Sequence, residues 1–98
     1  MQHAPDVEPA DLASRDFDVA FQVIEDHIDL PEDVCEKARK RARDIDDTEI
    51  ARGQSKAGIA SAAYLVTGVE HGIHLERSHL AEITGISPQT VAKYTEVI

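Results

Sequence analysis

The chain has 98 residues, of which 42% are hydrophobic, so it is long enough for one modest core and too short for two. Its only cysteine, Cys35, excludes an internal disulfide and any zinc site built on several thiolates, and it favours a reducing, cytoplasmic location. The formal net charge of −9 argues against a polyanionic partner unless the charge is unevenly spread. No apolar run approaches the ~20 residues that span a bilayer, and the N-terminus lacks the features of a signal peptide.

The acidic surplus lies entirely in the first third of the chain. Residues 1–33 contain ten acidic residues and one base, whereas residues 34–98 contain nine of each. Residues 1–13 mix proline with acid and have little apolar content, which predicts a flexible acidic tail. The surplus fits a solvated tail and helix face, or the acidic surface of a protein from a halophile. At molar salt the Debye length falls to ~3 Å, so long-range repulsion between the acidic segment and DNA would nearly vanish.

Two amphipathic helices are predicted next. The first covers 14–28, where apolar residues recur at helical spacing: Phe17, Ala20, Phe21, Ile24 and Ile28. Pro31 separates it from the second, because the residue before a proline disfavours the helical conformation. The second helix starts near Pro31, and its predicted buried stripe is Val34, Ala38, Ala42 and Ile45. Cys35 is expected in or beside the core as a small hydrophobe.

The third predicted helix, 56–70, is the central one. Residues 46–54 form a polar connection before it, and Ser55 is its expected N-cap. No charged residue lies between Lys56 and Glu70, which predicts a helix buried on all sides. Its glycines, Gly58 and Gly68, each cost ~1 kcal/mol relative to alanine, and close packing is the expected compensation. Gly72 is expected to end this helix. The helical spacing throughout predicts an all-α bundle without strands.

A helical corner is predicted at 76–98. Gly85 can adopt the left-handed conformation that stops a helix over 76–84, and a small residue at Ala81 allows the next helix to cross closely. Ser87 caps a last helix over 88–97, in which Val91 and Tyr94 turn back into the core. Such a corner is typical of a helix-turn-helix, whose second helix can lie in a DNA major groove.

The outward side chains of this corner are the candidate DNA contacts. Gln89 can pair with adenine, and Lys93 can reach guanine or phosphate. Ser87 and Thr90 suit phosphate or base edges, and Arg77, at the start of the fourth helix, suits phosphate. The alternative is a corner that only packs, with these side chains solvated.

A second basic feature lies on the second helix, at residues 36–43. It holds half of the chain's bases, which could contact phosphate or an acidic protein surface: Lys37, Arg39, Lys40, Arg41 and Arg43. The alternative is an ordinary solvated face paired with Glu36 and Asp44.

No motif for catalysis is present. The sequence has no Ser-His-Asp arrangement, no glycine-rich phosphate loop and no paired-carboxylate site, so an enzyme is not expected, nor is a cofactor. His71, His74 and His79 do not have the four-residue spacing with a carboxylate that metal-binding helices prefer, so a metal is not expected either.

Taken together, residues 14–98 resemble the second cyclin-like repeat of archaeal transcription factor B and its eukaryotic counterpart, transcription factor IIB. The resemblance rests on the central helix and corner, GQSKAGIASAAYLVTGVEHGIHLERSHLAEITGISPQTVAKY, and on DLPEDVCEKARKRARDI upstream. It implies a single cyclin-like five-helix domain ending in a helix-turn-helix, with a role in archaeal transcription initiation or its regulation. The implied partners are promoter DNA, read by the helix at 88–97, and the TATA-binding protein or RNA polymerase.

Two departures from the family pattern qualify what the resemblance implies. The family commonly has an arginine where this chain has Ala92, so the reading of a promoter element is not carried over directly. The full factors have two repeats and a zinc ribbon, so a single repeat is expected to be a fragment or a stand-alone relative. The alternative function is a protein-interaction module that docks a transcription protein through a groove of the cyclin box without binding DNA.

Overall fold

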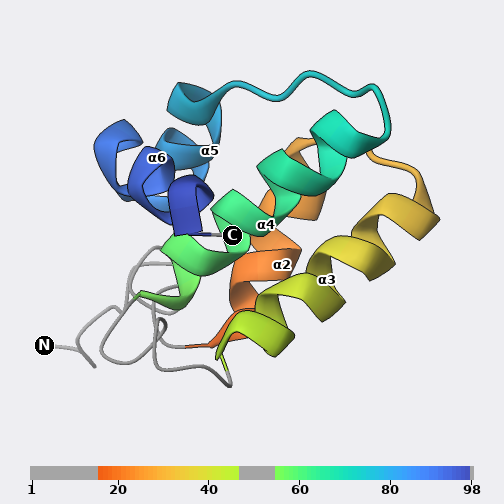
Figure 1. The fold of residues 1–98 in the computed structure, drawn as a ribbon, viewed down its shortest axis with the longest axis horizontal. Coiled ribbons are helices and arrows are strands. Elements are labelled where there is room, and N and C mark those ends of the chain that lie inside the picture. The colour runs from red at the N-terminus through yellow and green to blue at the C-terminus, as the bar shows by residue number, and fades with distance from the viewer. Residues whose placement is uncertain (1–15, 47–54, 98) are drawn as a thin grey trace, which may run out of the picture.

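Five helices surround one core in the computed structural model, which describes residues 16–46 and 55–97 (Figure 1). They are α2 (Phe17–His27), α3 (Glu32–Asp46), α4 (Lys56–Glu70), α5 (Arg77–Thr84) and α6 (Pro88–Val97). Those two ranges contain no strand. The predicted all-α class is therefore confirmed, while the expected acidic tail at 1–13 lies outside the described residues.

The first helix, α2, has clear ends on both sides. The carboxylate of Asp16 accepts a hydrogen bond from the Asp18 backbone N–H at 2.8 Å, which caps the helix. Ile28 is already extended, so α2 ends one residue earlier than predicted. The predicted apolar residues of its inner face are buried: Phe17, Ala20, Phe21 and Ile24.

The second helix, α3, begins directly after Pro31, whose carbonyl accepts from the backbone N–H groups of Val34 and Cys35 at 3.1 Å. Cys35 is 4% exposed, as expected for a small hydrophobe. Ile45, in the last turn of α3, was predicted to be buried but is only partly so.

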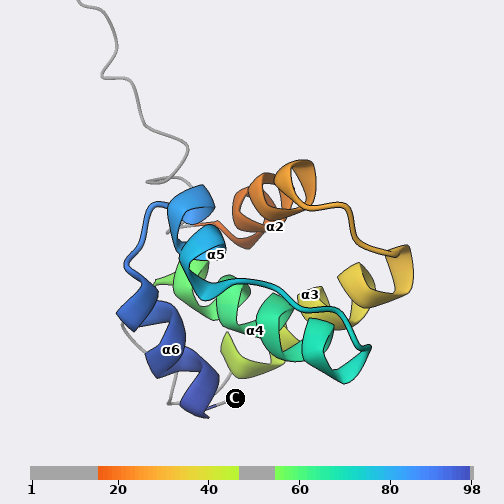
Figure 2. The ribbon, with the colours of Figure 1, turned by 90° about the horizontal axis from the view of Figure 1, so that it is seen from above.

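The central position of α4 is confirmed, because α4 contacts all four of the other helices (Figures 1 and 2). Ser55 caps it, accepting from the Gly58 N–H at 3.3 Å. The prediction that α4 is buried on all sides was wrong at its C-terminal end, where Val69 is 63% exposed. The neighbouring helix α6 lies beside the N-terminal half of α4, where Tyr94 contacts Gly58 (Figure 2).

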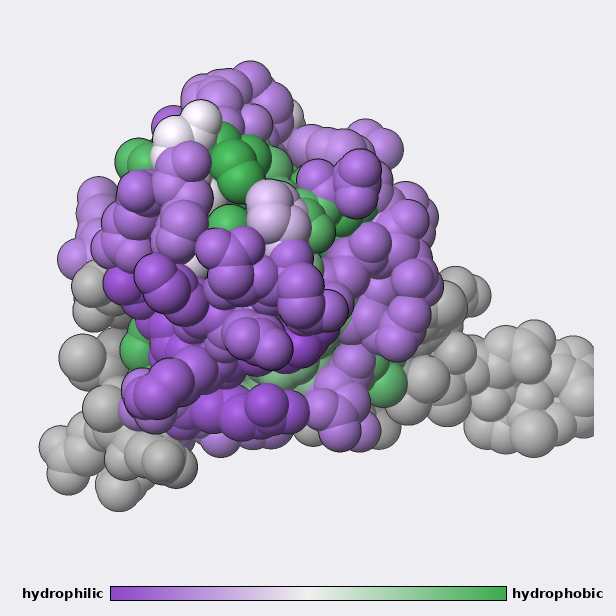
Figure 3. Space-filling model, turned by 90° about the vertical axis from the view of Figure 1, so that its right-hand side faces the viewer, coloured by the Kyte–Doolittle hydropathy of each residue, from purple (hydrophilic) through white to green (hydrophobic). Residues whose placement is uncertain are grey.

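Apolar surface is also visible at the end of the molecule formed by the α2–α3 connection and the C-terminal end of α4. Figure 3 looks at this end and shows apolar atoms between hydrophilic side chains.

Both glycines of α4 are explained by close contacts. A Cβ atom at Gly58 would lie 1.9 Å from Cε2 of Tyr94, so the tyrosine ring rests directly on the α4 backbone. A Cβ atom at Gly68 would lie 3.2 Å from the carbonyl oxygen of Ile73, in the chain that follows the helix. Gly72, with φ of 74°, supplies the left-handed residue that ends α4, as predicted.

A polar cluster ties three helices together. The Glu25 carboxylate on α2 accepts hydrogen bonds from Arg39 Nε on α3, at 2.9 Å, and from the Tyr64 hydroxyl on α4. Burial alone would raise the pKa of Glu25, but the bonds from Arg39 and Tyr64 outweigh it and lower this pKa below its usual 4.5. Burial, together with the bond to the carboxylate, raises the pKa of Tyr64. This cluster was not predicted, since its members are far apart in the chain.

Candidate nucleic-acid interface

The corner between α5 and α6 is built as a helix-turn-helix. Gly85 has φ of 76° and ends α5, and the Ile86 N–H donates to the Ala81 carbonyl at 3.0 Å. Ala81 is 2% exposed, which agrees with its predicted place at the helix crossing. The Thr84 hydroxyl donates to the Leu80 carbonyl at 2.7 Å and lies 3.3 Å from the hydroxyl of Ser61 on α4. This buried contact, which the sequence did not predict, ties α5 to α4.

The last helix, α6, is fixed at its start and along its inner face. Ser87 Oγ accepts from the Thr90 backbone N–H at 3.2 Å, which confirms the predicted cap. Val91 is fully buried and Tyr94 is 6% exposed, again as predicted. The Tyr94 hydroxyl accepts from the Ser55 backbone N–H at 3.3 Å, so α6 is also held at the beginning of α4. Because the inner face is fixed, the opposite face of α6 is presented rigidly to solvent.

The predicted contact residues take different positions on this corner. Gln89 and Lys93 are exposed and lie four residues apart, so they share one face of α6. Ser87 is exposed and Thr90 partly buried, and their hydroxyls lie 2.8 Å apart within hydrogen-bond distance of each other. Arg77 is exposed at the start of α5. The five predicted residues thus belong to one corner, although two of them already form the helix cap.

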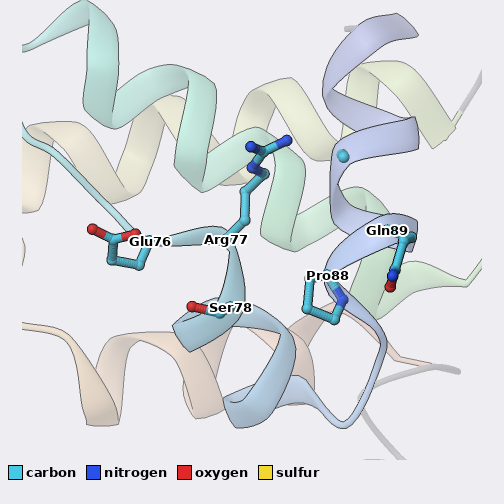
Figure 4. Close-up of a pocket in the computed structure, with 6 residues that line it drawn as sticks. Glu76, Arg77, Ser78, Pro88 and Gln89 are labelled. Atoms are coloured by element: carbon cyan, nitrogen blue, oxygen red, sulfur yellow. The ribbon is translucent and has the colours of Figure 1, made fainter.

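A pocket of about 350 Å³ opens between the first turns of α5 and α6 (Figure 4). Both Arg77 and Gln89 line it, and the complete lining is Glu76, Arg77, Ser78, Pro88, Gln89 and Ala92. Glu76 also lies 2.9 Å from Nε2 of His74. The sequence did not predict the pocket, because it depends on how two separate helices approach each other.

The cations of α3 have partners inside the molecule. Arg39 binds Glu25 and lies 3.5 Å from Glu32. Lys40 pairs at 2.8 Å with Asp44, one of the two acids that the alternative of a solvated face named. The other three reach other helices or the segment after α4: Arg41 to Glu70 at 2.9 Å and to the Thr67 hydroxyl at 3.1 Å, Arg43 to Asp18 at 2.8 Å, and Lys37 to His71 Nε2 at 3.3 Å. Most of these bases therefore connect helices, a role that the sequence did not reveal.

Arg77 and Lys93 differ from the other bases in the described part of the chain. Eight of the ten Lys and Arg residues fall within it, and Lys56, like the α3 cations, has a partner, Asp46, at 3.1 Å. Within residues 16–46 and 55–97, Arg77 and Lys93 have neither a hydrogen bond nor an ion pair. Both cations are therefore available to an external anion.

A second pocket, of about 390 Å³, lies between α2 and α3. It is lined by Asp18, Phe21, Gln22, Glu25, Arg39 and Arg43. Its charged groups bind one another in pairs, Arg39 with Glu25 and Arg43 with Asp18, and Arg43 also lies over the Phe21 ring at 5.1 Å. The lining contains no residue of the central helix α4, beside which the docking groove of the alternative function was expected.

The histidines near the corner do not converge. His71 Nδ1 lies 2.9 Å from the Thr67 carbonyl, His74 pairs with Glu76, and His79 is exposed. In the described ranges, no three His, Cys, Asp or Glu side chains gather as a metal site would require. None of the described helices is both long enough and apolar enough to cross a bilayer.

Comparison with known proteins gives one match. A family model described as "Transcription factor TFIIB repeat" matches residues 17–98, a range that holds all five helices and the corner. No curated protein and no solved structure matches the chain.

Proposed function

Because the chain belongs to the transcription factor TFIIB repeat family, we propose that it binds double-stranded promoter DNA through α6, in archaeal transcription initiation or its regulation. The family places the chain among transcription-related cyclin-like domains, which is a class of transcription factors and not of enzymes. Domains of this family function with DNA, the TATA-binding protein and RNA polymerase. In an archaeal cell, such a protein works in the cytoplasm, where the DNA is.

The observation that carries the proposal is the exposed face of α6. Gln89 and Lys93 project from a helix whose opposite face is fixed by Val91 and Tyr94. A major groove ~12 Å wide admits such a helix. In this position Gln89 pairs with adenine, Lys93 reaches guanine or phosphate, and Arg77 contacts the backbone beside the groove.

The remaining predicted contacts have smaller roles in this proposal. Ser87 and Thr90 cap α6 with their hydroxyls, so their contacts to phosphate or base edges use only the remaining hydrogen-bonding capacity. The α3 cations contact phosphate or a partner protein only by giving up an internal partner such as Glu70 or Asp18. Base recognition therefore rests on Gln89 and Lys93.

The charge distribution predicts weak DNA binding by the isolated chain, with a shallow salt dependence. The corner has only two unpaired cations, Arg77 and Lys93, and it also carries Glu76, Glu82 and Glu96. Two neutralised phosphates correspond to a slope of log K against log salt of about −1.8, far below that of proteins with six to ten contacts. Stable promoter binding then requires a protein partner, for which the TATA-binding protein and RNA polymerase are the family's candidates.

The test is a DNA-binding series with a duplex selected from a random pool, read by fluorescence anisotropy at several salt concentrations. Gln89→Ala should relax preference at one base pair by about 1–3 kcal/mol, while Lys93→Gln should weaken all sequences and reduce the salt slope by roughly 0.9. Lys40→Gln is the matched control, because it removes one charge from an exposed side chain on α3. An affinity that ignores both α6 substitutions would contradict the proposal.

The second candidate function is protein docking in the α2–α3 pocket, which the structure provides as a groove of about 390 Å³. An NMR titration separates the two candidates. Shifts on promoter duplex that cluster at 77–96 support DNA reading by α6, whereas shifts at 36–43 support contact through α3. Shifts on α2 and α3 upon addition of the TATA-binding protein, with none upon DNA, would favour docking.

A further inference from the structure

The C-terminal end of α4 presents apolar surface to solvent. Val69 is the one large hydrophobic side chain within residues 16–46 and 55–97 that is exposed, at 63%. Ile73 follows it in the chain and is only partly buried. The backbone N–H of Ile73 donates to the Gly68 carbonyl at 2.8 Å, which holds this residue beside the last turn of the helix. Val69 and Ile73 therefore remain close together at the end of α4.

The connection between α2 and α3 brings further apolar side chains to the same end of the molecule. Ile28 and Leu30 are both partly buried. The start of α3 is joined to the end of α4, because Lys37 Nζ lies 3.3 Å from His71 Nε2. Figure 3 looks at this end and shows apolar atoms lying between hydrophilic side chains. We call this part of the molecule, with Ile28, Leu30, Val69 and Ile73, the distal end.

The polar residues of the α2–α3 connection are acidic. Residues 26–36 contain no Lys or Arg and five acids: Asp26, Asp29, Glu32, Asp33 and Glu36. Glu32 lies 3.5 Å from Arg39, and Asp26 accepts a hydrogen bond from Gln22 at 2.7 Å. The side chains of Asp29, Asp33 and Glu36 are exposed and have no hydrogen bond or ion pair to any other described residue. Three carboxylates at this end are therefore available to an external cation.

The bases near the distal end do not cancel this charge. Arg41 is already paired with Glu70 at 2.9 Å. Lys37 contacts the neutral ring nitrogen of a histidine and has no acidic partner in the described part of the chain. Asp33 precedes Lys37 by four residues and so lies on the same face of α3. Three unpaired acids against one such base leave the distal end negative.

This charge decides which occupant fits the apolar surface. A nucleic-acid backbone or an anionic lipid would be repelled, and a second copy of the chain would bring the same acids into contact. We infer that the distal end docks a short basic, amphipathic segment of a partner protein. Apolar side chains of that segment cover Val69 and Ile73, and its Lys or Arg side chains pair with Asp29, Asp33 and Glu36.

The distal end lies at the opposite end of the molecule from the α5–α6 corner (Figures 1 and 2). A partner docked there does not compete with DNA for α6. It also shares no residue with the α2–α3 pocket that contains Phe21 and Arg43. The inference is thus independent of DNA reading by α6, and the two surfaces together would let the domain connect a DNA duplex to a basic protein.

The experiment uses synthetic peptides as probes for the full 98-residue chain. The basic probe is a fluorescently labelled, alanine-based helix with leucines one turn apart and lysines on either side of them. One matched peptide has glutamates in place of the lysines, and another has serines in place of the leucines. At about 0.1 M salt, where surface charges still act over ~10 Å, the basic probe should bind roughly tenfold more tightly than either matched peptide. Fluorescence anisotropy measures the affinities, and NMR shifts should cluster at 28–36 and 69–73.

Variants of the chain separate the apolar from the charged contribution. Val69→Ser removes exposed apolar surface without changing charge and should weaken the basic probe roughly tenfold. Asp33→Asn and Glu36→Gln should each weaken it about twofold to threefold and make binding less sensitive to salt. Glu82→Gln is the charge-matched control, because it removes one exposed carboxylate from α5 at the other end of the molecule, and it should have no effect. Far-ultraviolet circular dichroism verifies that each variant keeps its fold.

Three results would overturn the inference. The first is that the basic probe binds no better than the matched peptides. The second is that Arg43→Gln weakens the probe while Val69→Ser does not, which would place the peptide in the α2–α3 pocket. The third is a dimer, detected by sedimentation equilibrium, that Val69→Ser converts to monomer, since a second copy would then cover the surface.

The same variants keep this inference apart from the proposed function. Val69→Ser should leave DNA affinity unchanged, and Gln89→Ala should leave affinity for the basic probe unchanged. Failure of every selected duplex to bind would contradict DNA reading by α6 and leave the distal end as the docking surface. Loss of DNA binding in Val69→Ser would show that the two ends are not independent, contrary to the inference.

Discussion

The cations of α3 and those of the α5–α6 corner look alike in the sequence and behave differently in the structure. Arg39, Arg41 and Arg43 bind acids on neighbouring helices, whereas Arg77 and Lys93 have no partner in the described ranges. The dense basic stretch of α3 binds neighbouring helices to one another. The two bases of the corner, which stand apart from other bases in the sequence, remain available to a ligand. Charge density along the chain is therefore a poor guide to which cations bind a partner.

The largest expected effect is on stability and comes from removing one of the α3 cations that bind a neighbouring helix. Arg39→Met keeps most of the apolar stem but removes the hydrogen bonds to Glu25, so the free energy of unfolding should fall by about 2 kcal/mol. DNA affinity should stay within about twofold of wild type, because Arg39 binds acids of α2 and α3 and is not part of the proposed reading face of α6. Urea denaturation and anisotropy measure the two quantities. Weaker DNA binding at unchanged stability would instead make Arg39 a phosphate contact.

The next effect breaks the support of the reading helix. Gly58→Ala places a Cβ atom where the Tyr94 ring lies, and overpacking of this kind costs about 1–3 kcal/mol. Since the ring must move, α6 should shift and DNA binding should weaken as well. Gly72→Ala is the matched control, because a Cβ atom there meets nothing within 4 Å and only the left-handed backbone is strained. Equal loss of DNA binding in both variants would rule out a specific role for the Gly58 contact.

A pH titration sharpens the comparison further. The pKa of Glu25 is lowered in the folded state, so its contribution to stability is present above the unfolded value near 4.5 and is lost as the pH falls through the lower folded value. Glu25→Gln should therefore flatten the fall in unfolding free energy below pH 4.5, which urea denaturation at several pH values measures. An unchanged slope would show that other carboxylates dominate the acid limb.

The smallest effect concerns an exposed pair on α3. The Lys40 and Asp44 side chains are 78% and 63% exposed, so Lys40→Gln should change stability by less than about 0.5 kcal/mol. Its effect on DNA affinity should be no more than that of one unit of net charge. A loss comparable with that of Lys93→Gln would place α3 in the DNA interface.

Local sequence predicted much of the fold because the relevant forces are local. Helical spacing located the buried faces of α2 and α3, and Gly85 with Ser87 located the corner. The partners of Arg41 and Arg43 could not be predicted, since Glu70 and Asp18 come close only after the helices pack. The pocket beside Arg77 could not be predicted for the same reason.

One error came from treating the central helix as uniform. Its residues lack charge from Ala57 to Val69, yet the burial of the helix ends before Val69. Hydrophobicity predicts that a surface avoids water, but the lengths and directions of neighbouring helices decide how far the cover extends. Val69 lies beyond it.

The contact of the Tyr94 ring with the backbone at Gly58 has an evolutionary consequence. Neither residue can be exchanged freely while the other stays, since any side chain on the glycine strikes the ring. Descendants of this chain should keep the two together or replace both at once, with a smaller group at 94 compensating for a larger one at 58. A collection of related sequences in which the two positions drift independently would show that α6 is seated differently among them.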